Sequence, residues 1–239
     1  MDLKELESGV DPHVHWYYQV KKKPMFAYIR HLIKDKGVDT LIDLGSGSGF
    51  FSDILFEEFK GDLKKVWQVD IGYTDAEMAA TAGQPVEKCH YIPKSFENSV
   101  VIMMDVLEHL ESDLDMLNNI KENAAGDNNY YYITVPAFMS LWSPHDVYLG
   151  HYRRYKVNTL NAVLQKAQFT IENTYYMYGL IFPLVRLVRI LRKGKEAQSD
   201  MKPMGTLANS LLKWANSIEL PLRKSNKLAG VTCVGEGRI

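Results

Sequence analysis

A glycine-rich turn and a later aspartate are the residues best suited to hold a ligand. The run DLGSGSG (residues 43–49) lies between a short apolar run and a segment of helical spacing. Glycine permits backbone angles closed to other residues and lets a ligand approach the chain closely. Asp70 follows Gly49 by 21 residues, at the end of the next apolar run. A carboxylate there can accept two hydrogen bonds from ribose hydroxyls, so these features together predict a site for a nucleoside-bearing cofactor.

The spacing of the glycines points to a family. With Asp43 two residues ahead, the pattern G-x-G-x-G resembles motif I of the class I S-adenosylmethionine-dependent methyltransferases. The run MDVLEH (104–109) resembles the segment after the fourth strand in a large branch of that family. The resemblance covers residues 38–178 and implies S-adenosyl-L-methionine as the cofactor. The cofactor-binding residues that it implies are Asp43, Gly45, Ser46, Gly47, Gly49, Asp70, Ile71, Met104 and Asp105.

One part of the family pattern is missing. Members often carry an acid or amide after the third strand, where it binds the adenine amino group. Here the third strand is predicted at residues 90–92, and the PKSF run that follows has no acid before Glu97. We therefore expect backbone groups and apolar contacts to hold the adenine. The alternative to a cofactor site is an α/β protein whose glycine-rich turn binds no ligand.

Two further segments narrow the resemblance to one branch. The run HWYY (15–18) is similar to an H-W-W-[FY] stretch, and residues 135–155 are similar to a segment, in bacterial methyltransferases associated with cell-surface polysaccharide and glycolipid synthesis. This implies O-methylation of a sugar, a phosphate-bearing or a lipid-linked precursor in envelope glycan biosynthesis. One alternative is a methyltransferase for a quinone or another isoprenoid lipid. Another is a non-catalytic, cofactor-binding scaffold at the membrane.

Methyl transfer from a sulfonium to a hydroxyl needs an aligned nucleophile, exclusion of water and loss of a proton. His145 and His151 are candidate bases because imidazole titrates near neutral pH, and His109 is a third. Asp146 could orient a histidine, and paired arginines suit a carboxylate or phosphate. The predicted substrate-binding residues are His15, Trp16, Tyr17, Asp146, Arg153, Arg154 and Tyr155.

The same residues could have structural roles instead of catalytic or substrate-binding ones. Residues 136–156 could be a packed lid whose histidine and Arg–Asp contacts only hold it in place. Glu108 and His109 could cap the following helix instead of taking part in chemistry. His145, Asp146 and His151 are types that ligate metals, but their wide spacing leads us to predict no metal site.

Alternating strands and helices must position these side chains. Apolar runs predict strands at residues 40–44, 65–69, 90–92, 99–104, 130–135, 169–178 and 230–234. Helical spacing predicts helices near 49–59, 112–124 and 158–167. The alternation predicts an α/β fold with a mostly parallel sheet, and the family resemblance implies a Rossmann-like sheet of seven strands with the last antiparallel. We expect one domain over 1–239, with an N-terminal helical cover (1–36) and a substrate loop (136–156).

A basic, amphipathic helical insertion is expected over residues 179–228, before the last strand. Residues 180–230 hold ten basic and three acidic side chains, whereas residues 1–179 hold 17 and 25. Such helices can lie in the membrane interface and attract anionic headgroups. They can equally pack on the domain or on a second subunit. In the implied topology the insertion borders the substrate entrance.

The composition excludes several classes of protein. The 239 residues are 46% hydrophobic and 24% charged, which argues against disorder, and the net charge of −1 argues against general nucleic-acid binding. Cys89 and Cys233 cannot form a disulfide framework or a C-x-x-C zinc site. The acidic N-terminus is unlike a signal peptide, and no apolar run reaches about 18 residues. We expect a cytoplasmic protein, with contact at the inner face of the membrane through the insertion; its oligomeric state is not indicated.

Overall fold

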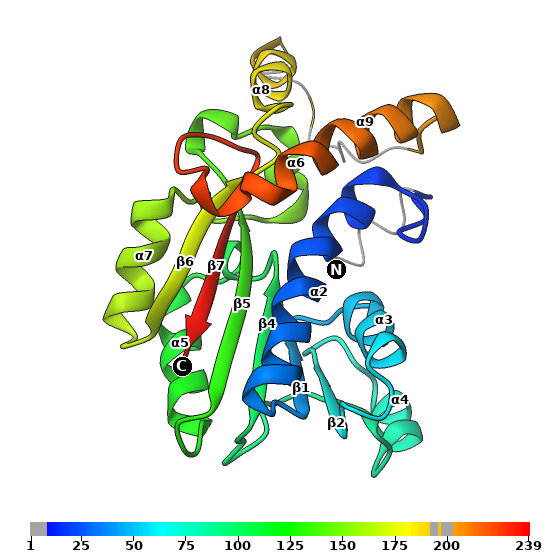
Figure 1. The fold of residues 1–239 in the computed structure, drawn as a ribbon, viewed down its shortest axis with the longest axis vertical. Helices are drawn as coiled ribbons and strands as arrows, with labels where there is room; N and C mark the ends of the chain where they lie inside the picture. The colour runs from blue at the N-terminus through cyan, green and yellow to red at the C-terminus, as the bar shows by residue number, and fades with distance from the viewer. Residues whose placement is uncertain (1–8, 192–195, 197–202) are drawn as a thin grey trace.

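The computed structural model describes residues 9–191, 196 and 203–239 (Figure 1). The helices are α2 (Trp16–Lys36), α3 (Phe50–Glu58), α4 (Asp75–Thr81), α5 (Asp113–Asn123), α6 (Pro144–Leu149), α7 (Val157–Lys166), α8 (Phe182–Leu191) and α9 (Thr206–Glu219). The strands are β1 (Thr40–Leu44), β2 (Lys65–Val69), β3 (Val86–Cys89), β4 (Ser99–Met104), β5 (Asn129–Pro136), β6 (Thr170–Met177) and β7 (Thr232–Arg238). Short 3-10 turns are η1 (Leu107–His109), η2 (Met139–Leu141) and η3 (Leu220–Ser225).

The strands form one sheet in the order β3-β2-β1-β4-β5-β7-β6. β1 pairs in parallel with β2 and β4, whereas β7 pairs antiparallel with β5 and β6. Only β7 runs against the others, as its arrow shows in Figure 1. The predicted Rossmann-like sheet with an antiparallel last strand is therefore confirmed, and the carboxyl ends of the other strands meet at one edge.

Helices cover both faces of the sheet, which explains the continuous apolar runs in its strands. β4 has the sequence SVVIMM, and all six side chains are buried. Val100, Ile102 and Met104 pack in the core that contains α2 and α3. Val101 and Met103 pack on the opposite face, in the core that contains α5 and α7.

Two strand predictions were wrong because those strands lack a clear apolar pattern. The third strand lies at Val86–Cys89, not at residues 90–92, and its VEKC side chains are only half-buried at the sheet edge. The last strand is Thr232–Arg238, not residues 230–234. Its buried Glu236 accepts a hydrogen bond from Asn173 and forms an ion pair with Lys224. A charged side chain therefore lies inside this strand and interrupts its apolar pattern.

The segment 136–156 is more regular than its sequence indicated. η2 and α6 both lie within it, and α6 starts with Pro144 at its first position after Ser143. The backbone N–H of Ser143 donates to the Asp146 carboxylate at 2.8 Å, which fixes the start of α6. A helix of six residues is too short to give a clear periodic signal.

The start of α2 and the insertion lie at the carboxyl-end edge of the sheet, while the rest of α2 packs on a face of the sheet. α8 and α9 connect β6 to β7, and Figure 1 shows them beyond the ends of the parallel strands, with α9 beside α2. Residues 1–8 of the expected cover and residues 192–195 and 197–202 of the insertion lie outside the described part of the chain. Among the described helices, none has the length and hydropathy required to cross a bilayer.

Candidate functional site

The glycine-rich turn after β1 is bound directly to the aspartate after β2. Gly45, Gly47 and Gly49 have φ angles of 66°, 52° and 76°, in the left-handed region that favours glycine. The backbone N–H of Gly47 donates to one Asp70 oxygen at 2.8 Å, and that of Gly72 donates to the other, also at 2.8 Å. The two segments predicted to share a cofactor are thus held together at one edge of the sheet.

Close packing adds a second reason for glycine at the ends of this turn. A Cβ atom at Gly45 would lie 2.7 Å from a methyl group of Val106. A Cβ atom at Gly49 would lie 2.5 Å from the amide nitrogen of Gln68. Both separations are shorter than van der Waals contact, so a larger residue would displace its neighbour.

The other predicted cofactor residues surround this turn. Ile71 is 89% exposed beside Asp70, so an apolar side chain is available to a nucleoside base. The Ser46 hydroxyl lies 2.8 Å from the Tyr73 hydroxyl and closes the turn from the other side. Asp43 is buried at the end of β1, and burial raises its pKa to about 6, although hydrogen bonds from Ser52 act in the opposite direction.

A cavity of about 450 Å³ opens at the carboxyl ends of β4, β5 and β6; residues 43–49 and 70–71 are not among those that line it. Its lining includes Met104 at the end of β4, Asp105 directly after it, and Pro136 at the end of β5. α2, α6 and the insertion supply most of the remaining wall. The predicted residues that line it are His15, Trp16, Tyr17, Met104, Asp105, His109, His145, His151 and Arg154.

Asp105 faces the cavity from a strained position and is paired with a buried lysine. Its φ angle of 60° is uncommon for a residue with a side chain. Lys21 of α2 forms an ion pair with its carboxylate, Tyr17 donates to it at 3.2 Å and Thr134 donates at 2.9 Å. Burial alone would raise the pKa of Asp105, but Lys21 and these hydrogen bonds lower it overall. Lys21 was not among the predicted site residues.

An aromatic wall adjoins this pair through Tyr17. Tyr17 stacks on Tyr178, with ring centroids 5.4 Å apart, and Trp16 meets Tyr178 edge to face at 5.6 Å. The Tyr178 hydroxyl donates to the backbone oxygen of Tyr17 at 3.0 Å. Tyr178 has a φ angle of 63°, so strained backbone occurs on two sides of the same cavity.

Asp146 holds the side chains behind the cavity. Its buried carboxylate lies 2.9 Å from Nδ1 of His151, 2.6 Å from Nε of Arg154 and 3.5 Å from Arg189 of α8. Burial alone would raise the pKa of Asp146, but the hydrogen bond from His151 and the charges of Arg154 and Arg189 hold it well below its usual range. An ionised Asp146 makes Nδ1 of His151 the donor, so in the neutral imidazole Nε2 is the accepting nitrogen.

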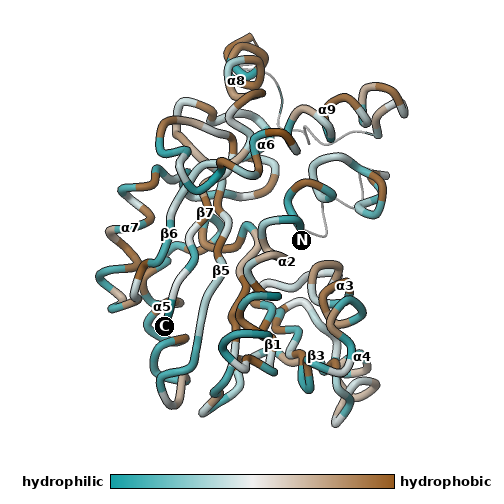
Figure 2. Tube along the Cα trace, viewed as in Figure 1, coloured by the Kyte–Doolittle hydropathy of each residue, from teal (hydrophilic) through white to brown (hydrophobic). Residues whose placement is uncertain are grey.

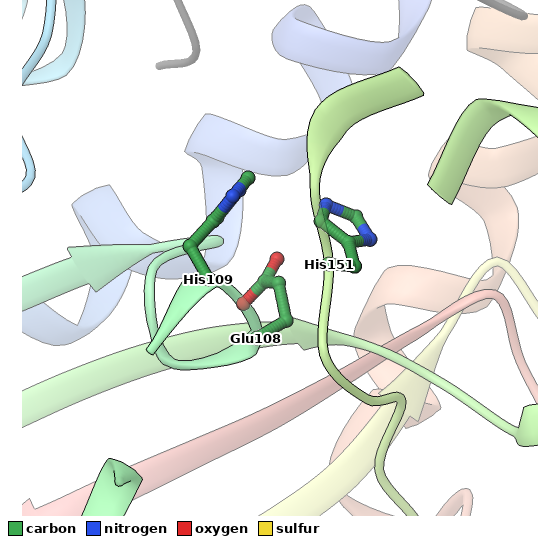
Figure 3. Close-up of side chains that lie close together, drawn as sticks. All are labelled: Glu108, His109 and His151. Atoms are coloured by element: carbon green, nitrogen blue, oxygen red, sulfur yellow. The ribbon is translucent and has the colours of Figure 1, made fainter. Parts of the chain in front are cut away.

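Glu108, His109 and His151 converge on the cavity from two segments (Figure 3). Their ligating atoms lie within 4.8 Å of one another. Glu108 is fully buried in η1, and burial raises the pKa of its carboxyl well above the usual value. The capping role considered for Glu108 and His109 is wrong, because Ser112 caps α5 by accepting from the Asp115 N–H at 3.3 Å.

Arg153 and Tyr155 do not line the cavity. The Arg153 guanidinium lies 3.2 Å from the Asp113 carboxylate, and the Tyr155 hydroxyl donates to the same carboxylate at 2.8 Å. Both therefore brace the loop against α5, as the lid alternative expected. Residues that sequence reasoning missed are Lys21, Glu108, Tyr178 and Arg189, and only Glu108 stood beside a predicted residue.

Comparison with known proteins rests on structure. No protein-family model matches the chain, and no curated protein sequence matches it. A methyltransferase from Archaeoglobus fulgidus, described as SAM dependent, superposes with a TM-score of 0.55 at 17% identity, covering 98% of this chain and 97% of that one. An S-adenosylmethionine-dependent methyltransferase from Mesorhizobium loti gives 0.54 at 12% identity, covering 92% and 100%. The chain therefore has the Rossmann-like fold of S-adenosylmethionine-dependent methyltransferases.

Proposed function

We propose that the protein transfers a methyl group from S-adenosyl-L-methionine to an oxygen atom of a small or lipid-linked acceptor. The observation that carries this proposal is the bond between the Gly47 N–H and the Asp70 carboxylate, at the same sheet edge as a cavity lined by Met104 and Asp105. In this arrangement Asp70 is available to ribose hydroxyls. The Gly45–Gly49 turn leaves room for the nucleoside, and the methionine end extends toward Asp105 and the cavity.

The cavity walls suit an acceptor with both apolar and polar parts. Trp16, Tyr17 and Tyr178 offer aromatic faces on which a sugar or an apolar ring can stack. Polar groups gather on the other side, where His109, His145 and His151 are candidate bases for the hydroxyl proton. Arg189 adds a cation at the wall formed by α8.

The apolar residues of the insertion support the proposal that the acceptor carries a lipid. α8 contributes Leu184, Val185 and Val188 to the cavity wall, and Ile181 immediately before it adds a fourth apolar side chain. None of its residues is buried, and Leu184, Leu187 and Ile190 are each more than half exposed. The apolar lining thus continues onto the exposed apolar side chains of α8. Figure 2 shows that α8 is mostly hydrophobic in sequence. A phosphate-bearing or lipid-linked precursor of an envelope glycan, the class implied by the sequence resemblance, fits this continuity.

The same surface supports contact with a membrane. α9 exposes Leu207, Leu211, Trp214 and Ile218, and the basic Arg186 and Lys213 are exposed beside the apolar residues of α8 and α9. Apolar side chains with adjacent basic groups are typical of helices that lie in an anionic lipid interface. Arg189 does not belong to this surface, because its guanidinium contacts Asp146 and the Leu141 oxygen. Arg192 lies outside the described residues.

A labelled-methyl assay tests the activity. The full chain is incubated with methyl-labelled S-adenosylmethionine and an envelope extract, and the label is followed into glycan, glycolipid and quinone fractions. We expect label in the glycan or glycolipid fraction, and its loss in Asp70→Asn. Label in the quinone fraction would replace the acceptor class with the isoprenoid alternative. Tight cofactor binding without any transfer would favour the non-catalytic scaffold and overturn the proposal.

Vesicle sedimentation tests membrane contact separately. The double variant Arg186→Glu/Leu187→Asp should pellet less with anionic vesicles than the wild type, while Lys94→Glu, an exposed charge reversal outside the insertion, should pellet normally. Equal pelleting of all three proteins, or equal binding to neutral vesicles, would contradict an anionic lipid surface as the partner.

A further inference from the structure

Two buried side chains near the cavity, Glu108 and His151, carry polar atoms without a hydrogen-bond partner among the described residues, and both belong to one cluster. Neither carboxylate oxygen of Glu108 has a hydrogen-bond partner among the described residues, and neither does Nε2 of His151. Glu108 is 0% exposed, and the His151 side chain is 5% exposed. A buried polar group without a partner costs about 1–3 kcal/mol, so such groups usually have a ligand, water or ion in the working protein.

The geometry identifies the kind of ligand that would satisfy the Glu108 oxygens and Nε2 of His151. One ligand atom from each of Glu108, His109 and His151 lies within 4.8 Å of the others, and in Figure 3 the carboxylate points between the two imidazoles. The rings of His109 and His151 meet edge to face with centroids 4.6 Å apart. A positive ion placed among them would accept electron pairs from the carboxylate and from the two rings together.

The residues behind the cluster already have the arrangement of a metal site. Asp146 accepts a hydrogen bond from Nδ1 of His151 at 2.9 Å and fixes the orientation of the ring, which lines the cavity. Histidine ligands of metals almost always donate their other nitrogen to a carboxylate or carbonyl in this way. Asp146 is itself held by Arg154 and by the Ser143 N–H, so the imidazole orientation does not depend on the ion.

We propose that Glu108, His109 and His151 bind one divalent transition-metal ion of the Zn²⁺ class at the cavity wall. Two imidazoles and one carboxylate suit Zn²⁺, Co²⁺ or Fe²⁺ better than Mg²⁺, which prefers oxygen ligands. Three protein ligands leave at least one coordination position open toward the cavity, as in catalytic sites. The sequence led us to predict no metal, because chain spacing alone did not bring Glu108 and His109 to His151.

The open position gives the ion a role that rests on the proposed function. An acceptor hydroxyl bound there would lose its proton to solvent more readily, because a divalent ion stabilises the alkoxide. The alkoxide oxygen then forms the new bond to the methyl carbon. The bond from that carbon to sulfur breaks, its electron pair stays on sulfur, and S-adenosylhomocysteine leaves. In this scheme His151 holds the ion and is not itself the base.

Metal binding can be tested without any methyl transfer. The full chain is stripped with a chelator, dialysed, and titrated with Co²⁺ while visible absorption and bound metal per chain are measured. We expect one Co²⁺ per chain, displaced by Zn²⁺ and not by Mg²⁺. Glu108→Gln and His151→Ala should each weaken binding at least about 10–100-fold. His31→Ala, which removes an exposed histidine paired with Asp35, should leave it unchanged.

A second measurement keeps the test independent of whether the variants fold. In the wild type, Zn²⁺ should shift the ring NMR signals of His109 and His151 and leave those of His31 in place. Absence of stoichiometric Co²⁺ binding, or shifts confined to other histidines, would overturn the metal site. Calorimetry with S-adenosylmethionine on the stripped protein separates the two proposals: metal binding without cofactor binding would remove the proposed function and retain the site.

Discussion

The backbone N–H of Gly47 donates a hydrogen bond to the carboxylate of Asp70 across 2.8 Å, joining the turn after β1 to the end of β2. The two residues are 23 positions apart in the sequence and belong to neighbouring parallel strands. In the chain as it stands, Asp70 therefore organises the turn with one oxygen and the Gly72 N–H with the other. When a nucleoside binds, the same carboxylate is in position to accept from ribose.

Asp70→Asn should weaken binding of S-adenosylmethionine about 10–100-fold. The variant keeps the shape of the side chain but removes a charge, and hydrogen bonds to charged groups contribute about 1.5–3 kcal/mol. Isothermal calorimetry of the variant and the wild type measures this loss. Asp75→Asn, an exposed carboxylate in the first turn of α4, serves as the control and should bind like the wild type. Unchanged affinity in Asp70→Asn would contradict the assigned role.

Gly49→Ala should destabilise the fold by about 2–4 kcal/mol. A Cβ atom there would push on Gln68, whose amide donates to Ser52 at 3.1 Å and to Asp53 at 2.7 Å. Gly83→Ala is the matched control: its φ angle is 74°, close to the 76° of Gly49, but nothing lies within 4 Å of its Cβ position. The control carries only the left-handed backbone cost of about 1–2 kcal/mol. Equal losses in urea unfolding would show that the contact with Gln68 is unimportant.

The free energy of unfolding of the Asp43→Asn variant, relative to that of the wild type, should increase as the pH rises. Burial raises the folded pKa of Asp43 to about 6 from its ordinary value of 3.8. Protonated Asp43 is therefore favoured in the folded state below about pH 4, and that advantage is lost as the pH rises through 6. The difference in unfolding free energy, variant minus wild type, should increase between pH 4 and pH 7 by roughly 2–3 kcal/mol, at about 1.4 kcal/mol per pKa unit. A pH-independent difference would indicate that Asp43 titrates normally.

Lys21→Met should destabilise the fold by about 1.5–3 kcal/mol, because it leaves the half-buried Asp105 carboxylate without the buried cation that pairs with it. The double variant Lys21→Met/Asp105→Asn should recover much of that loss, since no uncompensated charge remains. Urea unfolding of the wild type, both single variants and the double variant gives the coupling energy directly. A coupling below about 0.5 kcal/mol would mean that the ion pair contributes little.

Most of the sheet could be predicted from the sequence because its central strands are buried on both faces. β1, β2 and β4 have the boundaries that their apolar runs indicated. The edges could not be predicted in the same way. β3 is half-buried and β7 carries glycines and a buried glutamate, so neither has the pattern of a core strand.

The residues of the candidate site also fall into two groups, those with a local sequence signal and those brought to the cavity by packing. Its predicted cofactor residues stand in three short segments at the ends of strands (43–49, 70–71 and 104–105), where residue type and spacing give a local signal. Lys21 of α2 and Arg189 of α8 reach the cavity only through the packing of distant helices onto the sheet edge. Arg153 and Arg154 are adjacent in sequence, yet the first braces α5 while the second is buried against Asp146. Neighbouring residues of the same type in a loop give no signal of which one faces a ligand.

Equilibrium dialysis of the full chain against labelled S-adenosylmethionine tests the central claim most directly. The account predicts saturable binding of one molecule per chain, competed by S-adenosylhomocysteine and reduced at least about 10-fold by Asp70→Asn. Absence of saturable binding by the wild-type chain would contradict it.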